Sequence, residues 1–308
     1  MKLLFSVVWV WGNYLLEMIL MHVVNQQEEV KFWVIPHLNN LELLQATYIN
    51  HSFSKHIHEG FAIGVIERGA LTFSYRGEKV VAPAGHINLV IPGEAHDGNA
   101  ASAMGWSYRM FYLESALLEQ AAHEISGSIQ EAPFFKAGTI QDDYLADLIR
   151  NLHLLLEKPN IPLIEQESLL LTMLTEFILR HADERLLLRR VGKENPAVNR
   201  AREYIEDTYT QNISIKNLSN LCNLSPFHLI RAFKNSVGVP PHVYLKQVRI
   251  KRAKELVAKG FSIAFIAHEI GFTDQSHFSK QFKQITGITP SKYSNIIQEL
   301  SPARVTMK

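Results

Sequence analysis

The hydrophobic pattern between about residues 31 and 113 is that of short strands. Brief apolar runs are separated by Gly, Pro, Asn and His, and Leu71–Tyr75 alternates apolar with small polar residues. A period of two is typical of half-buried strands. The predicted strands are 31–35, 61–67, 70–76, 86–91 and 106–113, with turns at 68–69, 76–77, 83–85 and 92–93. Many short strands joined by close turns favour a β-sandwich or a small barrel.

After residue 114 the apolar spacing changes to three and four residues, which is typical of amphipathic helices. The predicted helices are 115–125, 141–157 and 163–182. One apolar stripe consists of Leu145, Leu148, Leu152 and Leu155. Such stripes either pack within the N-terminal half or form a homodimer contact, and the pattern leaves both open. Charges, Gly192 and Pro196 then break the periodicity, so 186–196 is predicted to be a linker.

The C-terminal part contains an internal repeat with an offset of 49 residues. The recurring positions are Leu229, Phe233, Gly238 and Pro241, which match Phe278, Phe282, Gly287 and Pro290. In each copy a short helix (215–222 or 262–270) is followed by a tight turn and by a second helix, which begins after Ser225 or Asp274. Both are good N-cap residues, and Gly271 suits the left-handed conformation of such a turn. Two helix-turn-helix units are therefore predicted.

The apolar spacing assigns one face of each second helix to the core. The expected inward residues are Leu229, Phe233 and Val237 in the first unit, and Phe278, Phe282 and Ile285 in the second. The residues expected to project are Phe227, His228, Arg231 and Lys234, and in the second unit Gln275, Ser276, His277, Ser279 and Lys280. Such side chains pair with base edges and phosphates. A merely solvated face is the alternative, and the cations matched between the copies favour DNA.

A long connecting helix is predicted over 243–259, with cations on its outer face. These cations are Lys246, Arg249, Lys251, Arg252 and Lys254. The helix would hold both recognition helices on one side of a duplex, in successive major grooves about 34 Å apart. Residues 193–308 contain 17 Lys and Arg against 8 Asp and Glu, a net charge of +9, whereas residues 1–192 have a net charge of −8. The basic part suits a polyanionic partner, although attraction between the two parts also explains the asymmetry.

The stretch from about 197 to 295 resembles the DNA-binding domain of the AraC/XylS family. The motif that carries the resemblance is Ala267-x3-Gly271-Phe272-x5-Phe278-x3-Phe282-x4-Gly287-x-Thr289-Pro290. The resemblance implies a bipartite domain of seven helices that binds promoter DNA and commonly activates transcription by contacting RNA polymerase. Ile230 departs from the family pattern, because relatives often have a polar base-reading residue there. Readout by the first unit is then expected to depend on Phe227, His228 and Arg231.

A group of histidines, His51, His56, His58 and His96, lies in the strand-rich part. This part, roughly 45–113, resembles a cupin, in which an HxH pair and a later His line a barrel around a metal. It also resembles the sugar-binding-type sensor domains that precede this DNA-binding domain in the family. The glutamate of metal-binding cupins is missing, since Glu59 follows the pair at once and by alternation points away. We therefore expect no cofactor and favour an organic ligand pocket over a metal site or a structural cluster. The predicted pocket residues are His56, His58, His96, Phe73 and Tyr75.

The single cysteine, Cys222, excludes an intrachain disulfide and a zinc finger and agrees with a reducing cytoplasm. Residues 3–24 are apolar over a length that could span a membrane, but Glu17 would be costly in mid-span. A membrane anchor and a packed apolar segment are alternatives. We favour extraneous upstream residues with the true start at Met18 or Met21, and expect no membrane partner.

Together these patterns predict an α+β multidomain protein. Its parts are an apolar extension (1–24), a cupin-like sensing and dimerisation domain (25–185), a linker (186–196) and a DNA-binding domain (197–308). The predicted function is that of a ligand-responsive, sequence-specific transcription regulator, a cytoplasmic dimeric activator with promoter DNA, a small-molecule effector and RNA polymerase as partners. No catalytic constellation is present in the sequence, so no enzyme activity is predicted. The alternative is a cupin-type metalloenzyme with an accessory nucleic-acid-binding module.

Overall fold

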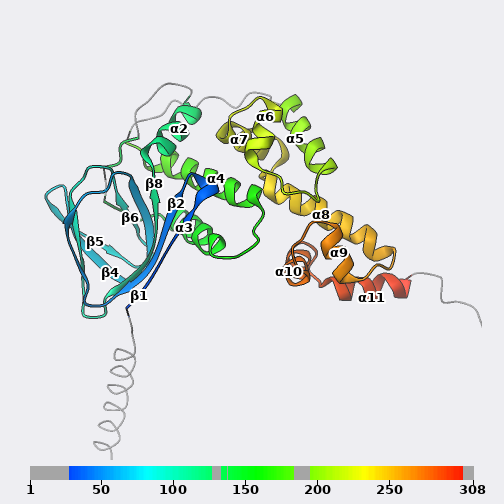
Figure 1. Cartoon of the computed structure of the whole chain (residues 1–308), viewed down its shortest axis with the longest axis horizontal. Helices are drawn as coiled ribbons and strands as arrows, with labels where there is room; N and C mark the ends of the chain where they lie inside the picture. Colours follow the sequence, from blue (N-terminus) through cyan, green and yellow to red (C-terminus); the bar gives the residue numbers. More distant parts are fainter. Residues whose placement is uncertain (1–27, 127–132, 137, 184–194, 301–308) are drawn as a thin grey trace, which may run out of the picture. The chain divides into compact units, whose positions relative to one another are not determined.

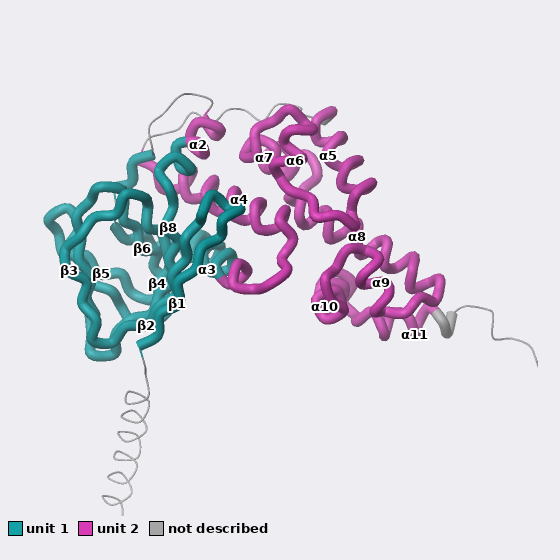
Figure 2. Tube along the Cα trace, in the orientation of Figure 1, with its two compact units in different colours: residues 1–119, 132–153 teal, residues 120–131, 154–308 magenta. Residues whose placement is uncertain are grey.

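The computed structural model describes residues 28–126, 133–136, 138–183 and 195–300 (Figure 1). The predicted extension 1–24 and most of the predicted linker lie outside the described residues. Internal contacts divide the chain into two compact units, residues 1–119 with 132–153 and residues 120–131 with 154–308 (Figure 2). The domain boundaries expected from the sequence stay predictions. Every helix within the described ranges is too short or too polar to span a membrane.

The described part of the first unit is built on a sheet of nine strands. The strands are β1 (Glu29–Ile35), β2 (Leu41–Tyr48), β3 (Ser52–His56), β4 (Phe61–Tyr75), β5 (Glu78–Pro83), β6 (Ile87–Val90), β7 (His96–Ala100), β8 (Trp106–Leu113) and β9 (Thr139–Ile140). Along the main path their order is β1-β2-β8-β4-β6-β9, while β7 pairs with β3 and β4, and β5 pairs with β4. The short helix η1 (Pro36–Leu38) joins the first two strands. The strand-rich N-terminal half is thus confirmed.

β4 is one strand of 15 residues, where the sequence predicted two strands and a turn at 68–69. Its first half pairs with β6 and β8, and its second half with β5 and β7. The predicted turn is wrong: a register shift between Ile66 and Arg68, with φ +68° at Gly69, forms a bulge that bends the strand without ending it. A Cβ at Gly69 would lie 2.1 Å from the carbonyl oxygen of Gly105. The residues before the bend pair with one set of strands and those after it with another. The bent strand β4 therefore connects both sets in the predicted cupin-like barrel (Figure 1).

Helices follow the barrel, as the change of periodicity predicted. They are α2 (Ser115–Ser126), α3 (Asp143–Leu156) and α4 (Leu163–His181). Leu145 and Leu152 on α3 are buried, and Leu148 and Leu155 are half-buried. The apolar stripe therefore packs within the chain. Its use in a homodimer contact stays a prediction.

The described C-terminal region contains the seven helices that the family resemblance implied. They are α5 (Asn195–Asp207), α6 (Ile215–Cys222), α7 (Pro226–Val237), α8 (Pro241–Ala258), α9 (Ile263–Glu269), α10 (Gln275–Thr286) and α11 (Pro290–Leu300). Ser214, Ser262 and Asp274 cap α6, α9 and α10 through their side chains. Asn223 and Gly271 adopt the left-handed conformation in the two turns. Both helix-turn-helix units are thus confirmed.

Two hydrophobic clusters support these two units. The first contains the inward residues of α6 and α7 together with Ile164 of α4 and Leu245 of α8. The second contains Ile250 and Val257 of α8 with the inward residues of α9 and α10. Because one continuous helix, α8, contributes to both clusters, it connects the units rigidly, as the sequence predicted.

Candidate effector pocket and DNA interface

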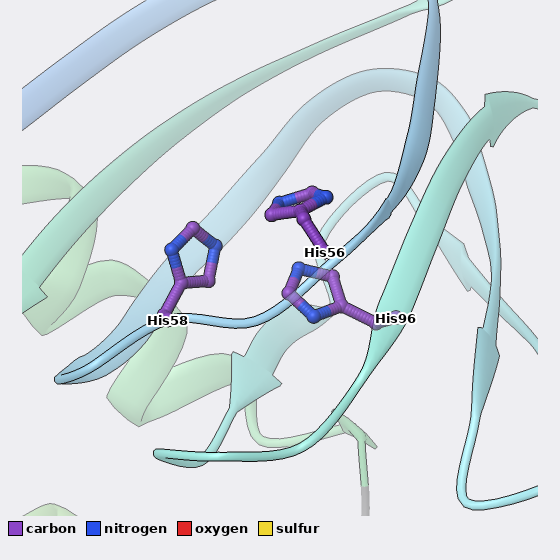
Figure 3. Close-up of side chains that lie close together, drawn as sticks. All are labelled: His56, His58 and His96. Carbon is purple, nitrogen blue, oxygen red and sulfur yellow. The ribbon is translucent and has the colours of Figure 1, made fainter.

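The three predicted pocket histidines lie together in the barrel. His56 ends β3, His96 begins β7, and the two residues face each other in the β3–β7 register. His58 follows two residues after His56, and its ring approaches both others (Figure 3). The ring centroids are 4.3 Å apart for His56 and His96, 4.9 Å for His58 and His96, and 5.0 Å for His56 and His58. The HxH spacing and the later histidine therefore build one cluster, as predicted.

The three histidines form a group of potential metal-ligand atoms. One ring nitrogen from each of His56, His58 and His96 lies within 4.8 Å of the others. The Nδ1 atom of His56 is 2.7 Å from the Ser54 carbonyl oxygen, and that of His96 is 3.1 Å from the Glu94 carbonyl oxygen. Such bonds make Nδ1 the donor and leave Nε2 as the free acceptor, which is the arrangement of metal-binding histidines.

The histidines form one side of a cavity of about 120 Å³. The sequence pattern predicted none of the other lining residues, which are Phe53, Ala62, Leu71, Asn88, Val90, Asp97, Gly98, Trp106, Tyr108, Met110 and Tyr112. Trp106, Tyr108, Met110 and Tyr112 alternate along β8. Their period of two was hidden because the intervening Phe111 and Leu113 are buried as well.

The cavity favours uncharged side chains. Burial, followed by the proximity of His96 and His56, lowers the pKa of His58 to about 4. Burial also lowers the pKa of His96, and it raises the pKa of Tyr112 to about 12. At neutral pH the site therefore offers neutral imidazoles as acceptors or ligands and protonated phenols as donors.

Phe73 and Tyr75 were predicted to line the pocket, and the structure does not place them there. Both are buried on the same face of β4 as Leu71. Their rings instead pack against Gly138, where a Cβ would lie 2.8 Å from Tyr75 Cδ1 and 3.2 Å from Phe73 Cε2. Neither residue lines the cavity that the histidines form.

The predicted exposure of Phe227 and His228 is wrong. These residues in the first turn of α7 are only 1% and 2% exposed. Helices α4, α5, α6 and α8 all contact α7, so a single apolar stripe did not describe its buried surface. Ile230, the residue that departs from the family pattern, is buried in the first hydrophobic cluster. Any role of Phe227 and His228 in DNA contact stays a prediction.

Arg231 and Lys234 lie on the more open side of α7. Lys234 is exposed, as predicted. Arg231 is half-buried and donates from Nη1 to the Ile125 carbonyl oxygen of α2 at 3.4 Å. Helix α2, which precedes the helix-turn-helix region in the sequence, thus covers one of the predicted DNA contacts of the first helix-turn-helix unit.

The second unit presents the polar surface that the sequence predicted. Gln275, Ser276 and Lys280 of α10 are exposed, and His277 and Ser279 are half-buried. Phe278 and Phe282 are fully buried, which fixes the opposite face of the helix. Ile285 was expected inward but is 44% exposed, because the two phenylalanines already fill the cluster. The predicted role of this surface in DNA contact is carried forward as a proposal.

The outer face of α8 agrees with the prediction only in part. Lys251 and Arg252 are exposed. Lys246 and Lys254 are half-buried, and Lys246 pairs with Glu165. Arg249 is only 4% exposed. The Arg249 guanidinium donates to the carbonyl oxygens of Tyr209 at 2.7 Å and Gln211 at 3.1 Å. A buried cation with such partners is structural. Arg249 therefore fastens the loop after α5 to α8 and is not a free cation for DNA.

The chain matches two known domain families in the order that the fold displays. Residues 38–174 match the AraC-like ligand binding domain, and residues 218–296 match a helix-turn-helix domain. An uncharacterized HTH-type transcriptional regulator of Bacillus subtilis, YbfI, is 30% identical over 82% of this chain and 90% of its own length. The arabinose operon regulatory protein of Escherichia coli is 27% identical over 76% of this chain and 80% of its own length.

A solved structure is similar to part of this chain. The C-terminal domain of AraT, a response regulator from Geobacillus stearothermophilus, is 28% identical over 39% of this chain and 95% of that chain, with a TM-score of 0.33. The matching full-length relatives are transcriptional regulators, and they do not support the alternative of a metalloenzyme with an accessory DNA-binding module. With both domains matched and a relative of this identity aligned over most of its length, the chain belongs to the AraC family of ligand-responsive transcriptional regulators.

Proposed function

We propose that the chain is a non-enzymatic, cytoplasmic regulator that binds an operator with both helix-turn-helix units and changes its DNA affinity when a small molecule enters the barrel. The observation that supports it most directly is the pair of units joined by the single helix α8. Family membership supports promoter DNA and an effector as partners. RNA polymerase contact, activation and a homodimer are further parts of the proposal.

In the proposed complex, the N-terminal half of α10 reads DNA directly. The Gln275 amide suits adenine, while Ser276 and Lys280 suit phosphate or guanine. These three side chains are exposed at one end of the helix. In the first unit the corresponding contacts fall to Arg231 and Lys234.

The effector is proposed to be a single-ring molecule with polar substituents. The barrel cavity of about 120 Å³ is somewhat smaller than a cavity of about 150 Å³ that accommodates benzene, which limits the effector to one ring at most. Trp106 offers an apolar face, and Asn88, Tyr108 and the histidines offer hydrogen-bonding groups. The relative named for the arabinose operon makes monosaccharides a sensible first set of probes.

A metal ion is a second candidate occupant of the same pocket. The bonds from His56 and His96 Nδ1 to carbonyl oxygens favour it, although the sequence favoured an organic ligand. His56, His58 and His96 would hold the ion, which would supply a Lewis-acidic position for an oxygen atom of the effector. Metal analysis of the purified protein, compared with His58→Ala, separates the two occupants: stoichiometric metal lost in the variant supports an ion.

DNA binding is tested by fluorescence anisotropy with duplexes from the region upstream of the gene. The expected result is specific binding that weakens steeply as salt rises, with a log–log slope reduced by about 1 in Lys280→Ala. Lys79→Ala, an exposed cation on β5, is the matched control and should retain the slope. Equal behaviour of the two variants, or no binding at low salt with a panel of sugars present, would contradict the proposal.

A further inference from the structure

The N-terminus of α7 is capped by a residue of another helix. Ser225 occupies the N-cap position, but its side chain accepts no capping hydrogen bond. The Phe227 amide instead donates to Glu124 Oε2 of α2 at 3.0 Å. Gln120 Nε2 donates to the other carboxylate oxygen, Glu124 Oε1, at 2.8 Å. The carboxylate is therefore held in place at the end of the helix that should enter the DNA groove.

A second contact joins the same two helices. Arg231 Nη1 donates to the carbonyl oxygen of Ile125, in the last turn of α2. The last carbonyl groups of a helix lack intrahelical partners and favour a nearby cation. An acidic and a basic contact thus fasten α2 to α7, and we name this pair of contacts the α2 clamp.

The second helix-turn-helix unit has no need of such a partner for its cap. Asp274 stands at the position that corresponds to Ser225, and its Oδ1 accepts from the His277 amide at 2.7 Å. Gln275 and Ser276, next to this cap, are exposed. The two copies of one motif therefore differ at the end that reads DNA: one caps itself, and the other is capped by α2.

The clamp uses the groups that a DNA backbone would use. A helix N-terminus is a ready anion site, and DNA-binding helices often place a phosphate there. A carboxylate in that place both occupies the amide and repels a phosphate. Helix α4 adds two similar contacts, since Glu167 accepts from the Ile215 amide of α6 and Glu165 pairs with Lys246 Nζ at 2.5 Å.

We propose that α2 and α4 hold the first helix-turn-helix unit in an autoinhibited state, in which Glu124 stands at the N-terminus of α7 in place of a DNA phosphate. The inference rests on the proposed function, because it assigns a regulatory contact to that DNA-binding unit. Full DNA binding requires α2 to leave α7, while the second unit stays free to contact DNA. The effector acts by shifting this equilibrium, which requires a difference in its affinity for the two states.

The test compares Glu124→Ala with Glu119→Ala in the full chain. Both variants remove one acidic group from α2, and Glu119 is exposed, so their effects on net charge are equal. Hydrogen exchange of the backbone amides in residues 227–231 is measured without DNA, and the affinity for an upstream duplex is measured without effector. We expect faster exchange in Glu124→Ala alone, with about tenfold tighter DNA binding, within the usual range of allosteric coupling.

Each outcome decides the inference. Equal exchange in the two variants overturns the clamp as a contact. Faster exchange without a gain in DNA affinity over Glu119→Ala overturns its inhibitory role. Failure of the wild type and both variants to bind any duplex overturns the proposed function and the autoinhibition with it, while the exchange data still report on the contact itself.

Discussion

Gly271 lies in the turn of the second helix-turn-helix unit. Its backbone conformation favours glycine, and the surrounding atoms leave no room for a side chain. Its φ is +83°, and a Cβ would lie 2.6 Å from the Thr210 carbonyl oxygen and 3.0 Å from Arg249 Nη2. Gly271→Ala should therefore lower the free energy of unfolding by about 3 kcal/mol, from the left-handed strain and the displaced loop together. Urea denaturation measures the change.

Gly287 provides a matched control. It has the same φ of +83°, but a Cβ there would meet no atom within 4 Å. Gly287→Ala should lower the free energy of unfolding by only about 1 kcal/mol, the cost of the backbone conformation alone. Equal losses in the two variants would show that the loop at Thr210 does not restrict residue 271.

His242 on α8 should make the stability of the compact unit that contains the helix-turn-helix region depend on pH. Burial lowers its pKa to about 4, with Glu165 acting in the opposite direction and Lys246 in the same direction. The unfolded chain takes up a proton near pH 6.5 that the folded chain refuses until about pH 4, so stability falls as pH drops through this range. The loss is about 3 kcal/mol in all.

Urea denaturation of the wild type and His242→Gln, at pH 7 and pH 4.5, isolates this contribution from those of the other buried histidines. The variant cannot take up the proton, so its stability should fall less between the two pH values. An identical loss in both proteins would mean that His242 titrates normally.

At the level of residues, the sequence predicted the groups whose spacing is local and missed those whose surroundings come from afar. His56 and His58 follow from the HxH pattern. Glu124 does not, because nothing in α2 distinguishes it from its exposed neighbour Glu119. Phe227 was assigned to the wrong side because α4, α5, α6 and α8 all contact α7, and three of these helices lie outside its motif.

Among the elements, the two second helices differ most clearly in their caps. The Asp274 side chain accepts from the His277 amide, whereas the Ser225 side chain makes no capping bond. Asp274→Ala should lower the free energy of unfolding by about 1 kcal/mol, the usual value of an N-cap. Ser225→Ala should cost much less, because the Glu124 carboxylate fills that role. Chemical denaturation of both variants checks the difference, and an equal cost would mean that Ser225 acts as a cap in solution.

The start of α10 was predicted correctly because Asp274 marks it as an N-cap residue. Boundaries were predicted poorly at glycine residues, because glycine occurs both in bulges within a strand and in turns that end an element. Gly69 lies in a bulge of β4, and Gly271 lies in a true turn, yet both have a positive φ. The strand pairing that distinguishes them is that of β4 with β8, where Gly69 lies opposite Trp106, and the local pattern does not specify it.

For the whole molecule, the order of a strand-rich half and a doubled helical half followed from periodicity and the internal repeat. The packing of α4 against the DNA-binding part did not follow from them. Helix α4 lies within the predicted sensing domain, and Ile164 on it is fully buried in the first hydrophobic cluster of the helix-turn-helix region. Contacts between segments that are distant in the sequence cannot be predicted from the local pattern of either segment.

This packing predicts how fragments of the chain should behave. A fragment 158–308 keeps Ile164, the Glu165–Lys246 ion pair and the Glu167 bond to the Ile215 amide, whereas the fragment 197–308, cut at the predicted boundary, loses all three. Burial of one isoleucine contributes about 2 to 3 kcal/mol, so the longer fragment should be more stable by at least about 3 kcal/mol in urea. Ile164→Ala in the longer fragment should remove much of that difference. Equal midpoints for the two fragments would mean that α4 does not stabilise the helix-turn-helix region. Helix α4 would then not be one of the helices that hold the first helix-turn-helix unit in the autoinhibited state.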